Sequence, residues 1–345
     1  MTLTTERVLA ASFSDDFNDG NAEGWETLDP LGALAGEAGS VTFPGGNACR
    51  LEHPAISQQA YISSVGMARM SFWRPDVIMA SQFQMSVDLL DLDQTTRRQE
   101  FGLNAQARDL GPGTTVCYLF HYLPVEGLLP GARNGFEIAR TFGEVYQSWM
   151  TGDYSGPYPD NNWYPGCNSS KPYTLDPAKD YRIVFLGSDL RFEGRVYNLA
   201  DLSKPVCVVV SNFSQASGGA YDFKDGTPGL QVQNLFGANA AGETGLYTGP
   251  CAATLDNFAV SDTYSAYPGT PDVPSLSVLL AEGKTVIAWP GENLGLWAMQ
   301  RSPALGEGAE WKDVNLWEIE YDAASGLRKH LVAEAPMAFY RLRKL

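Results

Sequence analysis

Apolar residues recur at alternate positions in short runs of this 345-residue chain, and this pattern limits its possible folds more than any other feature. The runs include Ser81–Leu89, Thr115–Phe120, Asn134–Arg140, Tyr181–Leu186, Leu190–Tyr197, Val206–Val210 and Gly245–Tyr247. A period of two places apolar side chains on one face of a β-strand, and turns rich in Gly, Pro, Asn and Asp separate the runs. No stretch longer than about three turns follows the helical period. The sequence therefore predicts an all-β protein.

The net charge of −16 is concentrated in the first four fifths of the chain. Residues 276–345 carry 8 Lys and Arg against 9 Asp and Glu, so the first 275 residues carry −15. Such an acidic domain repels nucleic-acid phosphates, which argues against a nucleic-acid partner. It suits a neutral or cationic ligand, bound Ca²⁺, or simply solubility. No run of about 18 apolar residues is present, so we expect no membrane span.

Two sequence motifs, called the end motifs below, mark the ends of a large domain. The first is Phe13-Ser14-Asp15-Asp16-Phe17-Asn18-Asp19-Gly20, and the second is Ala252-Ala253-Thr254-Leu255-Asp256-Asn257-Phe258-Ala259-Val260-Ser261. They resemble the F-x-D-D-F opening strand and the D-N-F-x-V closing strand of concanavalin-like jelly rolls, the group that includes laminin-G and pentraxin-like domains. The resemblance implies a jelly-roll β-sandwich over residues 13–262, after an extension of residues 1–12, with its first and last strands side by side.

A second, smaller domain is expected after a linker. Residues 263–275 contain three prolines, which stiffen a linker and hold two domains apart or at a fixed angle. Residues 276–345 are similar to fibronectin-like C-terminal modules of secreted bacterial proteins through Ile287–Pro290 (I-x-W-P), Met299–Trp311 and Phe339–Leu342 (F-Y-R-L). This resemblance implies a small β-sandwich that serves as an accessory or surface-attachment unit.

The jelly-roll resemblance also implies a structural Ca²⁺ and a disulfide. In many carbohydrate-binding jelly rolls an acid of the first strand meets an aspartate of the last, and here Asp16 and Asp256 stand at those places with Asn18 nearby. The alternative is that Asp256 caps a turn or accepts hydrogen bonds from backbone N–H groups. Cys49 and Cys251 lie near the two ends of the domain and are the implied pair, whereas five buried thiols are the alternative.

An aromatic segment is the main candidate for ligand binding. Residues 146–173 are too long and irregular for a tight turn, and among Gly, Pro, Asp and Asn they hold Trp149, Tyr154, Tyr158, Asp160, Asn161, Asn162, Trp163 and Tyr164. Aromatic rings can stack on sugars while the polar side chains bind hydroxyls. The same composition suits a protein contact or packing within the domain, so these alternatives stay open.

Catalysis has little support in the sequence. Retaining glycosidases of related jelly rolls carry E-x-D-x-x-E on one strand, and neither Asp88–Asp93 nor Glu318–Asp322 matches that pattern. Alternation places Cys117, Leu119 and His121 on one face of a strand, where a Cys–His dyad is conceivable. A packed histidine is the commoner outcome.

We therefore expect a non-catalytic extracellular or cell-surface protein that binds a glycan or another surface ligand. The alternative is a structural protein that self-associates into a surface fibre or layer, through the N-terminal segment or the aromatic segment. A glycoside hydrolase or lyase is a distant third. The N-terminus lacks the apolar stretch of a signal peptide, so export would use another route or follow removal of a leader.

Overall fold

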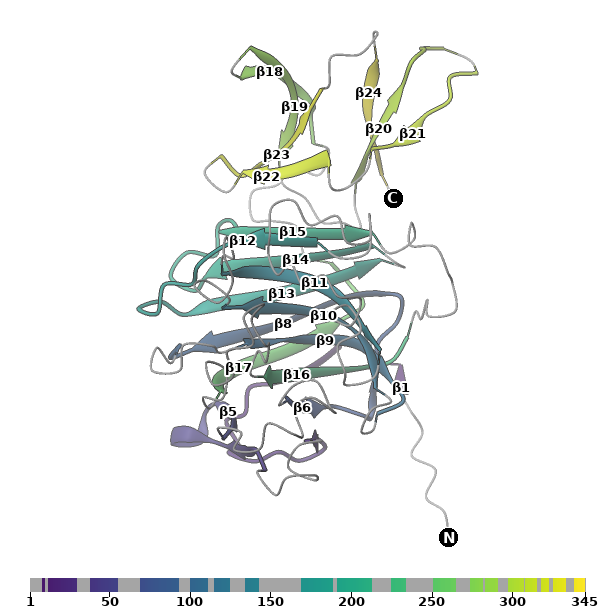
Figure 1. Cartoon of the computed structure of the whole chain (residues 1–345). Coiled ribbons are helices and arrows are strands. Elements are labelled where there is room, and N and C mark those ends of the chain that lie inside the picture. The colour runs from purple at the N-terminus through teal and green to yellow at the C-terminus, as the bar shows by residue number, and fades with distance from the viewer. Residues whose placement is uncertain are drawn as a thin grey trace, which may run out of the picture.

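A computed structural model of the whole chain gives the fold (Figure 1). The residues described here are 8–9, 12–29, 38–54, 69–92, 100–110, 115–124, 134–142, 169–188, 191–212, 225–233, 251–264, 274–281, 283–290, 297–306, 308–314, 318–322, 325–332 and 338–344. Almost all of them lie in strands and turns, so the predicted all-β class is confirmed. Within these residues no helix is both long enough and apolar enough to cross a bilayer.

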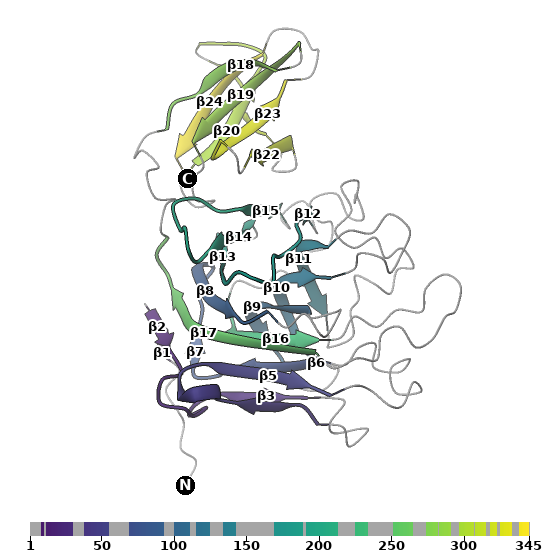
Figure 2. The same ribbon diagram turned by 90° about the vertical axis from the view of Figure 1, so that its left-hand side faces the viewer.

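Two antiparallel sheets face each other and form the large sandwich (Figure 2). The seven-stranded sheet has the order β12 (Ser169–Pro172), β11 (Gly135–Phe142), β10 (Val116–Leu123), β9 (Glu100–Arg108), β16 (Thr227–Gln233), β6 (Arg69–Trp73), β3 (Glu26–Leu28). The eight-stranded sheet has the order β15 (Cys207–Asn212), β14 (Arg191–Asn198), β13 (Tyr181–Ser188), β8 (Gln82–Leu90), β17 (Cys251–Ser261), β5 (Cys49–His53), β4 (Ser40–Thr42), with β2 (Ser12–Asp15) also paired to β17.

Alternating apolar side chains from both sheets fill one core. On β10, Tyr118, Phe120 and Tyr122 point into it, while Cys117, Leu119 and His121 occupy the other face of the strand, as the alternation predicted. Phe120 packs across the sandwich on Phe185 of β13, with ring centroids 5.8 Å apart. A Cβ on Gly194 would collide with the Phe120 ring, so the core at this point requires a residue without a side chain.

The two end motifs pair with each other, as the sequence predicted. β2 runs antiparallel to the second half of β17, with Asp15 opposite Phe258 and Phe13 opposite Val260. The first half of β17 pairs instead with β5, and residues 254–261 pair with β8 on its other side. A bulge with Asn257 at φ 50° separates the two halves. The closing strand is thus a central strand held by three neighbours.

The C-terminal residues form two smaller antiparallel sheets with a core of their own. One has the order β18 (Ser277–Ala281), β19 (Lys284–Pro290), β23 (Leu327–Leu331), β22 (Ile319–Asp322); the other has the order β21 (Lys312–Asp313), β20 (Trp297–Ser302), β24 (Phe339–Lys344). Ile287, Trp289, Met299, Val314 and Ile319 form the core between them. Two short elements complete the described part of the chain: a 3₁₀ turn at Pro44–Gly46, and a parallel pair of β1 (Val8–Leu9) with β7 (Val77–Ile78).

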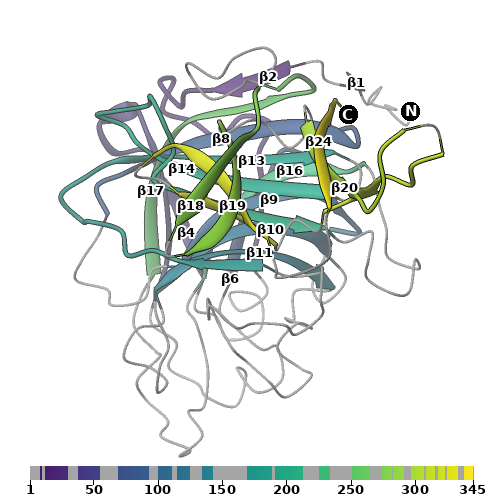
Figure 3. The same cartoon turned by 90° about the horizontal axis from the view of Figure 1, so that it is seen from above.

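The C-terminal module lies beyond the edge of the sandwich formed by β15 and β12 (Figures 1 and 3), and it contacts residues of β13 to β15. Tyr321 of β22 lies in an apolar cluster with Val184, Leu186, Tyr197 and Val208. Its hydroxyl donates a hydrogen bond of 3.2 Å to a backbone carbonyl in the turn before β15. The module is therefore packed against the jelly roll rather than held apart from it.

A buried ion cluster crosses the same interface. Glu193 of β14 is fully buried, and its two carboxylate oxygens accept hydrogen bonds from Arg195 Nε at 2.8 Å and from Arg328 Nη2 at 2.6 Å. Arg195 and Arg328 are 2% and 4% exposed. At the rim, the exposed side chains of Lys171 and Glu320 form a further ion pair at 3.2 Å. Charge as well as apolar area thus joins the module to the jelly roll.

Candidate functional site

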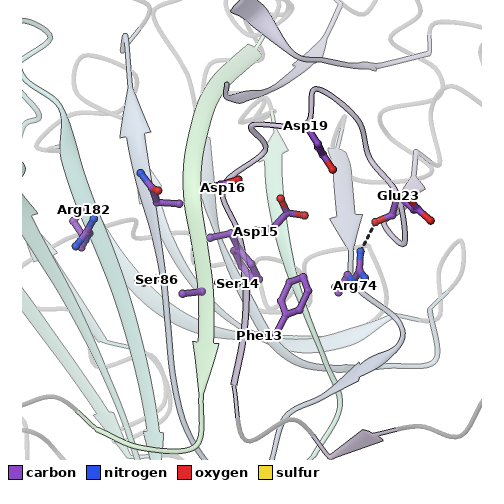
Figure 4. Close-up of a pocket in the computed structure, with 12 residues that line it drawn as sticks. Phe13, Ser14, Asp15, Asp16, Asp19, Glu23, Arg74, Ser86 and Arg182 are labelled. Carbon is purple, nitrogen blue, oxygen red and sulfur yellow. Dashed lines mark hydrogen bonds between the residues drawn. The ribbon is translucent and has the colours of Figure 1, made fainter. Parts of the chain in front are cut away.

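A hollow opens on the outer face of the eight-stranded sheet where β2 meets β17 (Figure 4). Its volume is about 760 Å³. It is lined by Phe13, Ser14, Asp15, Asp16, Asp19, Glu23, Arg74, Ser86, Arg182, Asn257, Phe258 and Ala259. Carboxylates outnumber guanidinium groups in this lining, so the hollow favours hydrogen-bond donors and cations.

Asp15 fixes the loop that forms one wall of the hollow. Its Oδ1 accepts a hydrogen bond from the backbone of Phe17 at 2.9 Å, and its Oδ2 accepts one from the indole N–H of Trp25 at 2.8 Å. Phe17 has a φ of 51°, and its buried ring packs on Trp25 with centroids 5.7 Å apart. The next carboxylate, Asp16, accepts the backbone N–H of Asn18 at 3.1 Å. These Asx turns give the wall a defined backbone.

Arg74 crosses the same loop. It donates a hydrogen bond to the carbonyl of Glu23, pairs with Asp76 at 2.8 Å, and lies 4.7 Å above the ring of Phe13 (Figure 4). A Cβ on Gly24, which has a φ of 79°, would meet the guanidinium group. The guanidinium group is therefore held in place by charge, by a carbonyl and by an aromatic ring.

A hydrogen-bonded network forms the opposite wall. Asp88 of β8 accepts two hydrogen bonds from Arg182 at 2.7 and 2.8 Å, and a third from Asn257 Nδ2 at 3.0 Å. Asp256 pairs directly opposite Asp88 on β17 and accepts the backbone N–H of Asn257 at 2.7 Å. The bidentate contact with Asp88 raises the pKa of Arg182. One carboxylate of the pair is thus neutralised by a cation.

The charged form of Asp256 is disfavoured by its surroundings. Burial raises the pKa of Asp256, and the nearby carboxylates of Asp88 and Asp16 raise it further, although the backbone of Asn257 acts in the opposite direction. The pKa of Asp16 is lowered, chiefly by its hydrogen bond with the backbone of Asn18. The predicted acids therefore lie near each other, and Asp256 also accepts a backbone bond in a bulge, as the alternative expected.

These groups do not form a metal cage by themselves. In the described part of the chain, no three His, Cys, Asp or Glu side chains are arranged to hold a metal ion. Ca²⁺ takes six to eight oxygen ligands. An ion bound to Asp16, Asn18 and Asp256 would need backbone carbonyls and water as its other ligands.

The predicted disulfide is wrong for this fold. Cys49 lies opposite Leu255, and Cys251 lies opposite His53, so the two cysteines sit four positions apart along neighbouring strands. That offset is about 13 Å, well beyond the Cα separation of about 7 Å that a disulfide can bridge. Both thiols are buried in the core, as the alternative expected. Burial raises the pKa of Cys49 to about 12.

The aromatic ligand-binding candidates lie outside the described residues. They are Trp149, Tyr154, Tyr158, Asp160, Asn161, Asn162, Trp163 and Tyr164. The strands at the two ends of this segment are described: β11 precedes the segment and β12 forms its last part, where Ser169 pairs with Ile138. The segment is therefore attached at both ends to one edge of the seven-stranded sheet.

That sheet carries a polar row on its outer face, which the sequence did not predict. The register aligns Ser71 of β6, Gln231 of β16, Gly102 of β9, His121 of β10 and Glu137 of β11. All four side chains are buried, and His121 Nε2 lies 3.7 Å from Glu137 Oε2. We call these four side chains the polar row. It ends beside β12, where the aromatic segment is attached.

The chain has only distant likeness to known proteins. No protein-family model matches the sequence, and the comparison with curated proteins found no match. Lectin II from Ulex europaeus has a TM-score of 0.40 and 8% identity, covering 72% of this chain and 97% of that one. The VIP36 exoplasmic/lumenal domain with Ca²⁺ and Man3GlcNAc (0.41, 12%, 75% and 91%) and the Crh5 transglycosylase with NAG (0.41, 12%, 75% and 86%) are similarly distant. At these values the likeness carries no inference about ligand or reaction.

Proposed function

We propose that this protein binds a glycan without chemically altering it, on the outer face of the seven-stranded sheet. The observation that carries the proposal is the polar row, which ends at the edge where the aromatic segment is attached. A sheet face offers hydroxyl, amide, imidazole and carboxylate groups along one line across five strands. Sugar hydroxyls both donate and accept hydrogen bonds, so such a mixed set of groups suits them.

The aromatic segment supplies the apolar part of the proposed site. Ligand sites combine aromatic side chains with a few well-placed polar groups. The segment follows β11, whose Glu137 belongs to the polar row and pairs with Ser170 of β12. Trp149, Tyr154, Tyr158, Trp163 and Tyr164 would stack on sugar rings, while Asp160, Asn161 and Asn162 would bind hydroxyls.

The test is binding to immobilised glycans, followed by calorimetry on the best ligand. Trp149→Ala and Trp163→Ala are each expected to lower the affinity at least about tenfold, or roughly 1.4 kcal/mol. Trp311→Ala is the matched control, since its ring lies under Arg341 in the C-terminal module at 4.2 Å. No binding by the wild type, or an equal loss in the control, would contradict the proposal.

A structural Ca²⁺ is a separate proposal that concerns the hollow. It is supported by the raised pKa of Asp256, because a divalent cation would reduce the repulsion among Asp256, Asp16 and Asp88. Melting with Ca²⁺ and with a chelator tests it. An identical midpoint in both conditions rules the ion out.

Self-association is the second candidate function. In the structure the N-terminal residues Val8–Leu9 pair with Val77–Ile78 of the same chain, so this part of the extension already has a partner strand. A different feature favours assembly: the edge strand β18 exposes Val278 at 70% and Leu280 at 81%. Light scattering of the wild type and of a Val278→Lys, Leu280→Lys variant tests it, and monomers in both samples would exclude assembly.

A location outside the cell or at its surface is part of the glycan-binding proposal. A domain of this size has a large core and does not depend on disulfides for its stability. Burial raises the pKa of Cys49 and Cys207 to about 12, which protects these thiols from oxidation. Fractionation of the native host cells, with the protein detected by antibody, would test the location.

A further inference from the structure

A pocket of about 310 Å³ lies at the junction between the C-terminal module and the jelly roll. The jelly roll lines it with β12, the start of β15 and the residues beside them, and the module lines it with β22 and β23. Figures 1 and 2 show β22 next to β12 and β15. We call this place the junction pocket. Small-molecule sites usually occupy about 300–1,000 Å³ and often lie between domains, so the junction pocket has the place and the size for one small ligand.

Apolar and aromatic side chains form the walls of the junction pocket. Tyr173 and Val206 pack against the jelly-roll core but are only partly buried, so each keeps some surface toward the pocket. Val208 and Tyr321 belong to the apolar cluster between the module and the jelly roll. Burial raises the pKa of both tyrosines, so their rings stay uncharged. The walls therefore offer rings and methyl groups, against which the C–H groups of a sugar ring can pack.

Two ion pairs form the rim of the junction pocket. Lys171 of β12 pairs with Glu320 of β22 at 3.2 Å, and Lys329 of β23 pairs with Asp322 of β22 at 2.6 Å. Glu320 and Lys329 also lie directly opposite each other on neighbouring strands. The charges of the rim therefore sum to zero. The least exposed of the four side chains, Asp322, is still 30% exposed, so a ligand can reach the rim without any rearrangement.

The rim groups retain capacity for further hydrogen bonds. An ammonium group has three donors, and within the described part of the chain Lys171 and Lys329 each use one. Glu320 accepts through Oε1, and no described residue binds its Oε2. A hydroxyl can accept from an ammonium group and donate to a carboxylate, so an uncharged polyol satisfies both without separating either ion pair. An anion would meet two carboxylates, and a cation would meet two ammonium groups.

We propose that the junction pocket holds one uncharged sugar unit of the glycan, so that the C-terminal module takes part in ligand binding. This inference rests on the proposed function. Lys171 and Tyr173 belong to the last part of the aromatic segment, so the pocket begins where that segment ends. The volume lies at the lower end of the range for small-molecule sites, which suits one ring rather than a chain. A longer glycan would continue outside the pocket.

A ligand in the junction pocket touches the jelly roll and the module at once. It therefore binds the docked arrangement and stabilises it. Bound glycan is expected to slow hydrogen exchange of the backbone amides at 206–208 and 320–322 at least about threefold, because local opening of the junction would require release of the ligand. Hydrogen exchange followed by mass spectrometry, with and without the neutral oligosaccharide that binds tightest among the immobilised glycans, measures this.

Three variants test the pocket by calorimetry with the same oligosaccharide. Lys171→Met and Glu320→Met each remove one rim charge from an exposed pair, which contributes little to stability, and each is expected to lower the affinity about three- to tenfold. Val206→Phe fills the pocket and is expected to lower the affinity at least about tenfold. Lys179→Met is the matched control and should leave the affinity unchanged, since its exposed pair with Asp176 at 2.8 Å lies outside the pocket.

The outcomes separate this inference from the proposed function. If the wild type binds no glycan, both are overturned. If Trp149→Ala weakens binding but none of the three pocket variants does, only the junction pocket is overturned. Unchanged exchange at 206–208 and 320–322, or an equal loss of affinity in Lys179→Met, also overturns the pocket. Stronger binding of a uronic-acid or a cationic amino-sugar oligosaccharide than of its neutral counterpart would overturn the proposed ligand class.

Discussion

Replacing Arg328 with methionine removes one of the two cations that hold the buried carboxylate of Glu193. The contact is a hydrogen bond of 2.6 Å between two buried charged groups, and it joins the module to the jelly roll. Hydrogen bonds to charged groups contribute roughly 1.5–3 kcal/mol. Arg195 remains 2.8 Å from the other carboxylate oxygen and still neutralises the charge. We therefore expect Arg328→Met to lower the free energy of unfolding by about 2 kcal/mol.

Glu193→Gln should cost more than Arg328→Met. It leaves two buried guanidinium groups beside a neutral amide, and loss of the counter-charge from a buried pair costs about 3–5 kcal/mol. Lys171→Met is the matched control, because its ion pair with Glu320 spans the same interface with side chains 39% and 68% exposed. An exposed pair contributes at most about 1 kcal/mol.

Equilibrium unfolding in urea, followed by tryptophan fluorescence, measures all three variants. The expected order of cost is Glu193→Gln, then Arg328→Met, then Lys171→Met. If Lys171→Met costs as much as Arg328→Met, burial does not determine the strength of these contacts. If Glu193→Gln costs least, the two arginines do not depend on the carboxylate, and the reasoning is refuted.

Two further predictions concern the hollow and the core. Asp256→Asn removes a carboxylate whose pKa is raised in the folded protein, so it should raise the melting temperature near pH 7 in chelator. A raised pKa means that the stability contribution of Asp256 is present at low pH and is lost as the pH rises through the folded pKa. The gain in melting temperature from Asp256→Asn should therefore vanish below the usual aspartate pKa of about 3.9. A gain that persists at pH 3 would contradict this, and Asp19→Asn is the control. Gly194→Ala should destabilise the sandwich by about 1–3 kcal/mol, because the new methyl group meets the Phe120 ring. Adding Phe120→Leu should restore part of that loss in a urea titration, and a purely additive double variant would show that the two positions do not touch.

Much of the fold could be predicted because it depends on local pattern. The period of two on β10 correctly separated Cys117, Leu119 and His121 from the core-facing residues. The two end motifs correctly predicted the pairing of β2 with β17. The disulfide could not be predicted in this way, because knowing that two strands are neighbours does not tell which of their residues lie opposite each other. Cys49 and Cys251 lie on strands that do pair, but they are offset by four positions and are too far apart to bond.

The polar row could not be predicted from the sequence for a different reason. Gln231 and Gly102 are far apart in the chain and become neighbours only because β16 is inserted between β9 and β6. Alternation within one strand places Asn104 away from the core, but it does not reveal that the outer face is also buried. The available signal was one polar residue at a non-core position of each of four strands, namely Ser71, Gln231, His121 and Glu137, which is also typical of a solvated face.

The pairing of β2 with β17 can form only late in synthesis of the chain. These two strands are separated by nearly the whole jelly roll, so their contact is among the most non-local in the chain. A ribosome makes Phe13 early, yet its partner Phe258 emerges only after some 240 further residues. Until then the opening strand stays exposed to aggregation. Sandwich closure must await the release of β17, and the C-terminal module, made after it, can dock only on a sheet that has already formed.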